Sequence, residues 1–358
     1  MRAWTISEIG GELRCTDVSK PGLRGGGALL EVLAVHVPAY TREVVSGRRN
    51  YSFPAPAILG PGCLGRVEEV AADVFNVRPG DLVLNTALLD AGRVDDPQEI
   101  LVGWTGVGWD GTPSDETRAM QAAWRDGACA EFALAPKESL VTLSGAEEYP
   151  DPARLAFLGW LSVAAEGLVR AGQGPGHVVT IVGATGQMGT AALLVALARG
   201  AARVVAAGRN RSTLDELAQL DRRVVPVALT GDRAADAAAI LGAGGGSDIV
   251  LDALGMVPGP DATMAGYDSL RPAGTMVLVG GVRHELPLPY GQIMRRRQTI
   301  LGSWMAGPST VLTVWELVRA GLIDLDVLDV RRVSLDDPGA GLRTAAESTG
   351  PHFAALVP

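Results

Sequence analysis

The chain has 358 residues, 47% of them hydrophobic and 20% charged, which is the composition of a globular protein rather than a disordered or membrane-spanning one. That length is enough for two domains, each with its own core. A formal net charge of −9 argues against nucleic acid as a partner, because gripping phosphates requires clustered Lys and Arg. The basic run 295–297 is typical of a solvated helix end.

The cysteines and the N-terminus indicate where the protein resides. Cys15, Cys63 and Cys129 lie far apart and form neither a disulfide framework nor a paired metal-binding motif. The N-terminus runs directly into strand-like sequence without an apolar signal region, and no apolar stretch is long enough to span a bilayer. We therefore expect a cytoplasmic protein that does not bind membranes.

Short apolar runs separated by turns dominate up to about residue 150. Strands are predicted over 28–35 and 65–70, and a turn feeding a strand over 77–84. This part should form a compact, mostly antiparallel β domain. Residues 86–128 interrupt the pattern with a Gly-, Asp- and Trp-rich stretch that has one possible helix, over 115–124. Such a long excursion is either a functional lid or partner-binding element, or a packed surface insertion.

After Asp151 the pattern changes to alternating strands and helices. Asp151 is predicted to cap a helix that has Pro152 in its first turn and an apolar face running to Leu168. Buried strands alternating with helices specify a doubly wound parallel sheet of six strands. The predicted strands are 178–182, 204–207, 224–227, 249–252, 276–279 and 299–301, and the predicted helices are 190–198, 212–220 and 311–319.

A glycine-rich turn joins the first of these strands to its helix. Gly183 allows a tight exit from the strand, Gly186 lets the backbone approach a pyrophosphate, and Gly189 lets the helix pack on the sheet. The N-terminus of the helix then offers free N–H groups to phosphates. The predicted dinucleotide-binding residues of this turn are Gly183, Thr185, Gly186, Gln187, Met188 and Gly189.

The end of the second strand predicts which dinucleotide binds. An NAD site places a carboxylate there for the ribose 2′-hydroxyl, whereas this chain has Gly208 followed by arginines. Guanidinium groups suit a 2′-phosphate, so NADP(H) is the predicted cofactor. The predicted contacts are Gly208, Arg209, Asn210, Arg211 and Ser212, with Ser212 also capping the next helix. The alternative is that the arginines are ordinary loop residues; the missing acid also weakens a methyltransferase interpretation.

With a β-rich first part and a Rossmann domain after residue 150, the layout resembles the medium-chain dehydrogenase/reductase superfamily. Residues 248–255, 272–281 and 301–303 are similar to that family's last three Rossmann strands. The resemblance implies a GroES-like catalytic domain (1–150 and 306–358), a Rossmann domain (151–305) and a homodimer paired through the sixth strand. It adds Ala253, Leu254, Gly280, Gly281 and Ser303 to the cofactor contacts.

Matching motif to motif, the positions of the family's catalytic zinc ligands hold residues that cannot bind metal. They are Pro38, Pro61, Gly62 and Gly159. The structural zinc lobe is also absent, because residues 86–128 contain no cysteine. No metal site is predicted, and the chain looks like the zinc-independent quinone oxidoreductase and enoyl reductase branch, which moves hydride from NADPH to an activated C=C bond or a quinone.

Without a metal, a proton donor must assist hydride transfer. Tyr51 lies in a segment resembling one that lines that branch's substrate cleft, and Tyr40 follows Pro38; these are the candidate catalytic residues, although either tyrosine could be structural. Trp160, beside Gly159, would fill the emptied zinc site and shape an apolar substrate pocket, or pack within its helix. His36 is interpreted as a core histidine.

Two other functions stay open. One is NADPH-dependent reduction of a ketone or imine in a specialised pathway, and the other is non-catalytic NADPH binding. A short-chain reductase is excluded, because no tyrosine in the chain has a lysine four residues later and the glycine turn lies in mid-chain.

Overall fold

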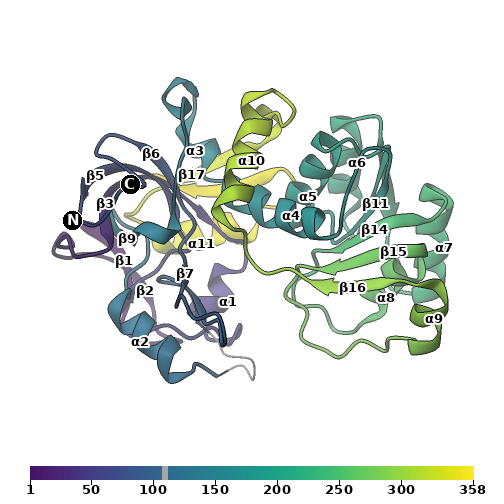
Figure 1. Cartoon of the computed structure of the whole chain (residues 1–358), viewed down its shortest axis with the longest axis horizontal. Coiled ribbons are helices and arrows are strands. Elements are labelled where there is room, and N and C mark those ends of the chain that lie inside the picture. The colour runs from purple at the N-terminus through teal and green to yellow at the C-terminus, as the bar shows by residue number, and fades with distance from the viewer. Residues whose placement is uncertain (107–111) are drawn as a thin grey trace. The chain divides into compact units, whose positions relative to one another are not determined.

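The computed structural model describes residues 1–106 and 112–358, which divide into two compact units (Figure 1). Unit 1 comprises Met1–Gly159, Leu328–Ser348 and His352–Pro358, and unit 2 comprises Trp160–Val327 and Thr349–Pro351. Trp109, in the predicted insertion, lies outside the described residues. Across the described ranges, no helix is both long and apolar enough to cross a membrane.

Unit 1 is built mainly from antiparallel strands, as the sequence predicts. In the described part of the chain, β2-β1-β4 form one sheet, and β10-β6-β5-β3-β18-β17 form a second in which β9 also pairs with β3; only β17 and β18 run parallel. The bounds are β1 Arg2–Ile6, β2 Leu13–Asp17, β3 Gly27–Val37, β4 Ala57–Ile58, β5 Cys63–Val70, β6 Leu82–Asn85, β9 Phe132–Pro136, β10 Leu140–Thr142, β17 Asp329–Val333 and β18 His352–Leu356.

The described part of the insertion folds as a packed layer. Strand β7 (Leu88–Asp90) pairs with β8 (Glu99–Leu101), and helix α2 (Asp115–Ala123) begins at Ser114, whose hydroxyl accepts the Thr117 N–H at 3.0 Å. Ala87, Leu89, Ile100 and Val102 form its core, against which Met120 and Trp124 pack. This packing favours a surface insertion over a loose lid.

The helix predicted after Asp151 is two helices. Asp151 caps α3 (Pro152–Leu155) as predicted, but the chain turns at Phe157 before α4 (Leu158–Arg170) begins. Phe157 is fully buried and its ring packs against His36 and Phe353 of unit 1. Tertiary packing therefore interrupts a pattern that by itself suits one continuous helix. Short helices of unit 1 also include α1 Thr41–Val45, η1 Lys137–Ser139, η2 Ala146–Glu148 and α11 Pro338–Ala346.

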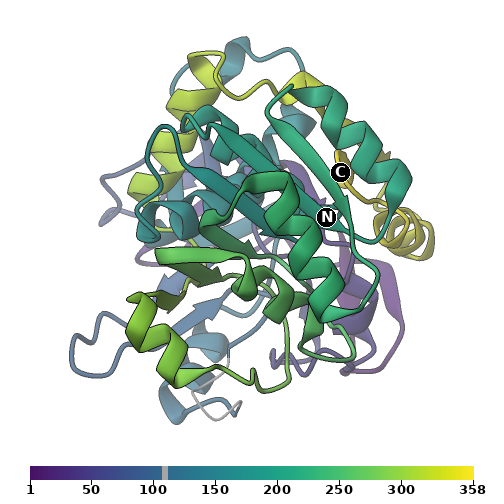
Figure 2. The ribbon, with the colours of Figure 1, turned by 90° about the vertical axis from the view of Figure 1, so that its right-hand side faces the viewer.

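Unit 2 contains the predicted six-stranded parallel sheet, which Figure 2 turns toward the viewer. Its order is β13-β12-β11-β14-β15-β16, so the direction of winding reverses between β11 and β14, which is where such sheets bind ligands. The bounds are β11 Val178–Val182, β12 Arg203–Gly208, β13 Val224–Ala228, β14 Ser247–Asp252, β15 Leu270–Leu278 and β16 Thr299–Gly302.

Helices of unit 2 connect and cover these strands. They are α5 Gln187–Ala198, α6 Arg211–Leu220, α7 Arg233–Gly244, α8 Asp261–Asp268, α9 Tyr290–Arg296, α10 Pro308–Arg319 and η3 Leu325–Val327. The compact units differ from the predicted domains at three places: residues 151–159 lie in unit 1, and residues 306–327, which include α10, and 349–351 lie in unit 2 rather than in the first domain. The place of α10 agrees with a contact distant in sequence, since the Thr310 hydroxyl of α10 donates to the Glu166 carboxylate of α4. The basic run 295–297 ends α9, as predicted.

Candidate functional site

The glycine turn is fastened to the neighbouring strand by its backbone. Gly183 has a positive φ of +85°, and the N–H groups of Gly183 and Ala184 both donate to the Ala207 carbonyl, at 2.9 and 3.0 Å. Helix α5 starts at Gln187, three residues earlier than predicted, because the Gly186 carbonyl already accepts the Thr190 N–H. Gln187, Met188 and Gly189 therefore form the first turn, whose N–H groups have no acceptor within the helix.

Gly189 is the tightest point of this turn. A Cβ atom there would lie 2.3 Å from the Gly183 carbonyl oxygen and 2.5 Å from the Ala184 Cα, so any side chain would push the helix off the turn. At Gly186 the nearest atom is the same Gly183 oxygen at 3.5 Å, an ordinary contact. The close packing of the helix predicted for Gly189 is present, against the turn that follows β11, and it keeps the first-turn N–H groups beside the end of that strand.

The end of β12 has no room for a carboxylate. A Cβ atom on Gly208 would lie 2.7 Å from the Thr185 Cγ2, so Thr185 of the glycine turn occupies that space. Arg209 and Arg211 follow; both are exposed, and neither makes an ion pair in the parts of the chain that the structure describes. Their charge is available to an anion.

The cap of α6 differs from the prediction. Asn210, not Ser212, is the N-cap, and its side chain accepts the Thr213 N–H at 3.3 Å. Ser212 lies inside the first turn, where its hydroxyl donates to the Asn210 side-chain oxygen at 2.8 Å. Asn210 takes the role because it is the last residue with extended backbone before the helix.

A second group of predicted contacts lies at the carboxyl ends of β14, β15 and β16. Ala253 N–H donates to the Val182 carbonyl at 2.9 Å, and Gly281 N–H donates to the Leu254 carbonyl at 2.8 Å. A Cβ atom on Gly280 would lie 2.2 Å from that Leu254 oxygen. Ser303 is 6% exposed, and its hydroxyl has no hydrogen-bond partner among the described residues.

These residues fit a dinucleotide. The glycine turn supplies a close backbone approach and the N-terminus of a helix for a pyrophosphate, and the arginines after β12 supply charge at one end. At the other end lies the buried Ser303 hydroxyl, which has no hydrogen-bond partner among the described residues. The structure thus brings all the predicted cofactor contacts to one edge of the parallel sheet.

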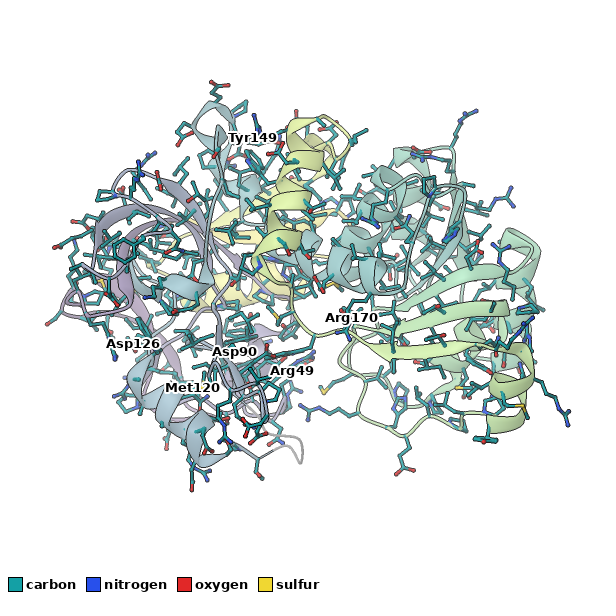
Figure 3. All side chains as sticks on the ribbon, in the orientation of Figure 1. Arg49, Asp90, Met120, Asp126, Tyr149 and Arg170 are labelled. Carbon is teal, nitrogen blue, oxygen red and sulfur yellow. The ribbon has the colours of Figure 1, made fainter. Side chains whose placement is uncertain are left out.

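The two predicted catalytic tyrosines meet in unit 1. The rings of Tyr40 and Tyr51 lie 6.3 Å apart, centroid to centroid, and Trp104 of the insertion lies 6.2 Å from each. The guanidinium of Arg49, labelled in Figure 3, lies 3.8 Å above the Tyr40 ring and 5.8 Å from the Tyr51 ring. We call these four residues the tyrosine cluster.

Sequence reasoning placed neither Trp104 nor Arg49 at this site, and the charged member is Arg49. It is 8% exposed and pairs with Glu43 of α1 at 3.2 Å. Burial by itself would lower the pKa of Arg49, but hydrogen bonding to Tyr51 and to Glu43 outweighs it and the pKa is raised, so the charge is held. Arg48 beside it is exposed, and nothing in the sequence distinguishes the two arginines.

The Tyr40 phenol is buried within this cluster. Burial raises its pKa, the neighbouring Tyr51 raises it further, and the charge of Arg49 opposes both. Tyr40 therefore keeps its proton at neutral pH and can serve only as a neutral hydrogen-bonding group.

The insertion holds the Tyr51 segment in place. Ser52 carbonyl accepts the Gly106 N–H at 3.0 Å and the Gln121 side-chain amide at 2.6 Å, and the Ser52 hydroxyl donates to the Gly106 carbonyl at 2.6 Å. Trp104, which is 2% exposed, completes the contact. The position of Tyr51 thus depends on residues more than fifty positions later in the chain.

The positions that correspond to the family's zinc ligands do not fit zinc. Pro38, Pro61, Gly62 and Gly159 offer no ligating side chain, and a Cβ atom on Gly62 would lie 2.2 Å from the Asn85 carbonyl oxygen. Within residues 1–106 and 112–358, no group of three or more His, Cys, Asp or Glu residues could hold a metal ion.

Two further predicted residues have different outcomes. His36 is 6% exposed and its ring packs against Phe157 and Phe353, at 5.5 and 5.2 Å, so the interpretation as a core histidine is confirmed. Trp160 is half-buried on α4 in unit 2, whereas the tyrosine cluster belongs to unit 1. Its role in a substrate pocket stays a prediction.

Part of the chain matches a known family model, and curated relatives are similar over most of its length. Residues 188–320 match the family model described as zinc-binding dehydrogenase. A probable zinc-binding alcohol dehydrogenase of Mycobacterium tuberculosis is 26% identical over 98% of this chain and 86% of its own length. An NAD-dependent alcohol dehydrogenase of Sulfurisphaera tokodaii is 25% identical over 90% of each chain.

Solved structures agree in fold. An alcohol dehydrogenase from Thermus sp. ATN1 has a TM-score of 0.82 at 21% identity, covering 100% of this chain and 99% of its own. A protein assigned to the zinc-binding dehydrogenases from Sinorhizobium meliloti 1021, bound to NADP, has a TM-score of 0.82 at 20% identity with the same coverage. In fold, the chain is therefore similar to these dehydrogenases.

Proposed function

We propose that this protein is an NADPH-dependent reductase that works without zinc and transfers hydride to a C=C bond conjugated with a carbonyl group, or to a quinone. The observation that carries the cofactor choice is the end of β12. Thr185 leaves no room for an acid at Gly208, and the exposed Arg209 and Arg211 make no ion pair in the described chain. Both features suit a ribose that carries a 2′-phosphate.

The test is to replace Arg209 with alanine. Arg209→Ala should weaken NADPH binding by about 1.5–3 kcal/mol, which is about 10- to 150-fold, because a hydrogen bond to a charged group is lost. NADH binding, measured in the same fluorescence titration, should stay unchanged. Arg203→Ala is the matched control, because Arg203 lies at the opposite end of β12. Equal losses for NADPH and NADH would contradict the assignment.

We propose that the tyrosine cluster donates the proton that accompanies hydride transfer. When bound, NADPH supplies a hydride. Conjugation spreads the developing negative charge onto a carbonyl oxygen of the substrate, so one hydrogen-bond donor can stabilise it. Tyr51 is the proposed donor, because Arg49 and Tyr40 lie against its ring and the insertion fixes its backbone.

Independence from zinc is supported by the residues themselves. All four positions that correspond to the zinc ligands are proline or glycine, and three of them lie on loops. Gly62 cannot carry any side chain without displacing Asn85. Metal analysis of the purified protein should find no stoichiometric zinc, and chelators should leave activity intact. One zinc ion per chain would overturn this part of the proposal.

Carbonyl reduction is the second candidate. The relatives described above are named as alcohol dehydrogenases. Because the reverse of alcohol oxidation reduces a carbonyl group, these names support a ketone as the substrate of this chain. A panel of enones, quinones, ketones and imines, followed by NADPH absorbance, separates the two. Turnover of ketones alone would replace the first candidate, and NADPH binding without any turnover would indicate a non-catalytic protein.

We also propose a homodimer formed along β16. This strand lies at the edge of the sheet and pairs only with β15 in the described chain, and an unpaired edge is a natural site for pairing with another copy. Exposed Tyr290, Met294 and Trp304 lie close to it in the sequence. Light scattering should give twice the chain mass, and a monomer would rule the dimer out.

A further inference from the structure

Gly350 lies far along the chain from the glycine turn but contacts it. Residues Thr349–Pro351 belong to unit 2, although the chain on both sides of them, Leu328–Ser348 and His352–Pro358, belongs to unit 1. Gly350 is buried, and its N–H donates to the Thr185 carbonyl of the glycine turn at 2.8 Å. A tertiary contact, rather than its place in the chain, therefore brings this short segment to the glycine turn.

Gly350 also packs on the first turn of α6. Its φ is +61°, and a Cβ atom there would lie 2.5 Å from Cγ2 and 3.9 Å from Cβ of Thr213. Apart from its chain neighbours, no other atom of the described residues lies within 4 Å of that point. A side chain at this position would therefore push on α6 and not on the glycine turn.

Thr213 is joined to the residues that are proposed to bind the 2′-phosphate. Its N–H donates to the Asn210 side-chain oxygen at 3.3 Å, and Asn210 lies between Arg209 and Arg211. Thr213 is 5% exposed and β-branched, so its methyl group has few other positions available. A push on this methyl group would therefore displace the first turn of α6 together with the two arginines.

Thr185 joins Gly350 to the end of β12. The Thr185 carbonyl accepts the Gly350 N–H, and the Thr185 Cγ2 would lie 2.7 Å from a Cβ atom on Gly208. Gly350 thus contacts the two parts of the chain that flank the end of β12, the glycine turn by a hydrogen bond and α6 by packing. Only a residue without a Cβ atom fits between them at this positive φ.

We infer that Gly350 is a positioning residue for the choice between NADPH and NADH. It fixes the first turn of α6 relative to the glycine turn, and so keeps the arginines after β12 beside the ribose end of the site. This inference rests on the proposed function, because it assigns to Gly350 the placement of Arg209 and Arg211 toward a 2′-phosphate. NADH lacks that phosphate, so its binding depends on the glycine turn and not on this placement.

The experiment measures the affinities of Gly350→Ala for NADPH and NADH by fluorescence titration. The added Cβ atom would displace Thr213 but not the glycine turn. NADPH should bind about tenfold more weakly, the low end of the loss for a hydrogen bond to a charged group, and NADH should stay within about twofold of the unmodified protein. Gly350→Asn should give the same change, because asparagine adopts positive φ more readily than alanine and keeps the clash.

Thr213→Ser, added to Gly350→Ala, is the rescue variant. Serine lacks Cγ2, and the remaining Cβ contact of 3.9 Å is ordinary. NADPH affinity should return to within about twofold of the unmodified protein, whereas the Tm should stay lowered because alanine at positive φ is still strained. Gly321→Ala is the matched control: Gly321 has a φ of +69°, and no atom of the described chain lies within 4 Å of a Cβ atom there. It should lower the Tm and leave both affinities unchanged.

Arg209→Ala, measured in parallel, tests the proposed function separately. Equal weakening of NADPH and NADH by Gly350→Ala would indicate a merely structural role and overturn the inference alone. Unchanged affinities, or a loss that Thr213→Ser does not restore, would also overturn it. An unmodified protein that binds NADH as tightly as NADPH would overturn the proposed function and the inference together.

Discussion

Two regions of the molecule, the cofactor edge of unit 2 and the tyrosine cluster of unit 1, are built by different means. The cofactor edge is the edge of the parallel sheet that carries the glycine turn (183–189) and the residues after β12 (209–212). At the cofactor edge, one continuous segment from β11 through the glycine turn to β12 carries the first group of predicted contacts, and the glycine turn offers mainly backbone atoms. In the tyrosine cluster, side chains at positions 40, 49 and 51 meet Trp104 of the insertion. The first depends on glycines that leave space, and the second on large side chains that fill it.

This difference determines how each region should respond to mutation. A backbone cradle is damaged by any added atom, whereas a side-chain cluster is damaged by removing a charge or a hydroxyl. The first three predictions below use that contrast, in decreasing order of expected effect, and the fourth tests the burial of the thiols in unit 1.

Gly189→Ala should have the largest effect. The added Cβ would meet the Gly183 oxygen at 2.3 Å, so α5 must shift and the first-turn N–H groups move with it. We expect NADPH binding to be lost and the free energy of unfolding to fall by about 1–3 kcal/mol, the usual cost of overpacking. Denaturant unfolding and fluorescence titration measure the two effects.

Gly186→Ala is the control for Gly189→Ala, because its Cβ would have only a 3.5 Å contact with the same oxygen. Its stability should stay within about 0.5 kcal/mol of the unmodified protein. If Gly189→Ala binds NADPH normally, the backbone cradle is not what holds the cofactor.

Tyr51→Phe should act on turnover alone. Losing the proposed proton donor should lower kcat by about 10²- to 10⁴-fold, with little change in NADPH affinity because the cofactor contacts lie in unit 2. Tyr40→Phe is the comparison: the Tyr40 phenol is buried and keeps its proton, so a smaller loss is expected. A Tyr51→Phe enzyme with normal kcat would show that the donor lies elsewhere.

Arg49→Met should destabilise unit 1. It removes a charge that is 8% exposed and leaves Glu43, its partner at 3.2 Å, without a cation. The expected loss is about 1–2 kcal/mol in urea unfolding, below the cost of breaking a fully buried pair because Glu43 is partly exposed. Arg48→Met, at the exposed neighbour, should change stability by less than about 0.5 kcal/mol. Matching losses would mean that the cluster does not depend on this cation.

The smallest effect is expected from labelling the cysteine thiols, because labelling requires no substitution and leaves the fold intact. Burial raises the pKa of Cys63 to about 12, and it also raises the pKa of Cys129, so almost no thiolate forms at either near pH 8. At that pH a thiol reagent should label half-buried Cys15 first, and all three cysteines only after denaturation. Because reactivity follows the thiolate, labelling of Cys63 should rise only as the pH approaches 12. Rapid labelling of Cys63 at pH 8 would show that the loop beside Gly62 opens.

The sequence predicted the secondary structure around the glycine turn well because its signals are local. Strand β11 has the predicted bounds, and the glycines and Arg209 lie at the predicted points of the turn and of β12. The errors there are small and also local: α5 starts three residues early, and Asn210 rather than Ser212 caps α6.

The tyrosine cluster could be predicted only in part. Tyr40 and Tyr51 were identified by resemblance, but Arg49 was indistinguishable from Arg48 until the structure showed which of them is buried. The break at Phe157 and the place of α10 were missed for the same reason, since each depends on a contact with a distant segment.

By itself, the sequence determined the parallel sheet, the glycine turn and the arginines after β12, because hydrophobic periodicity and glycine spacing act between residues close together in the chain. Tertiary structure alone decided that Trp104 and Gln121 of the insertion would hold the Tyr51 segment, and that Ser303 would be buried at the end of β16. Such contacts join residues far apart in the chain, and no short-range pattern specifies them.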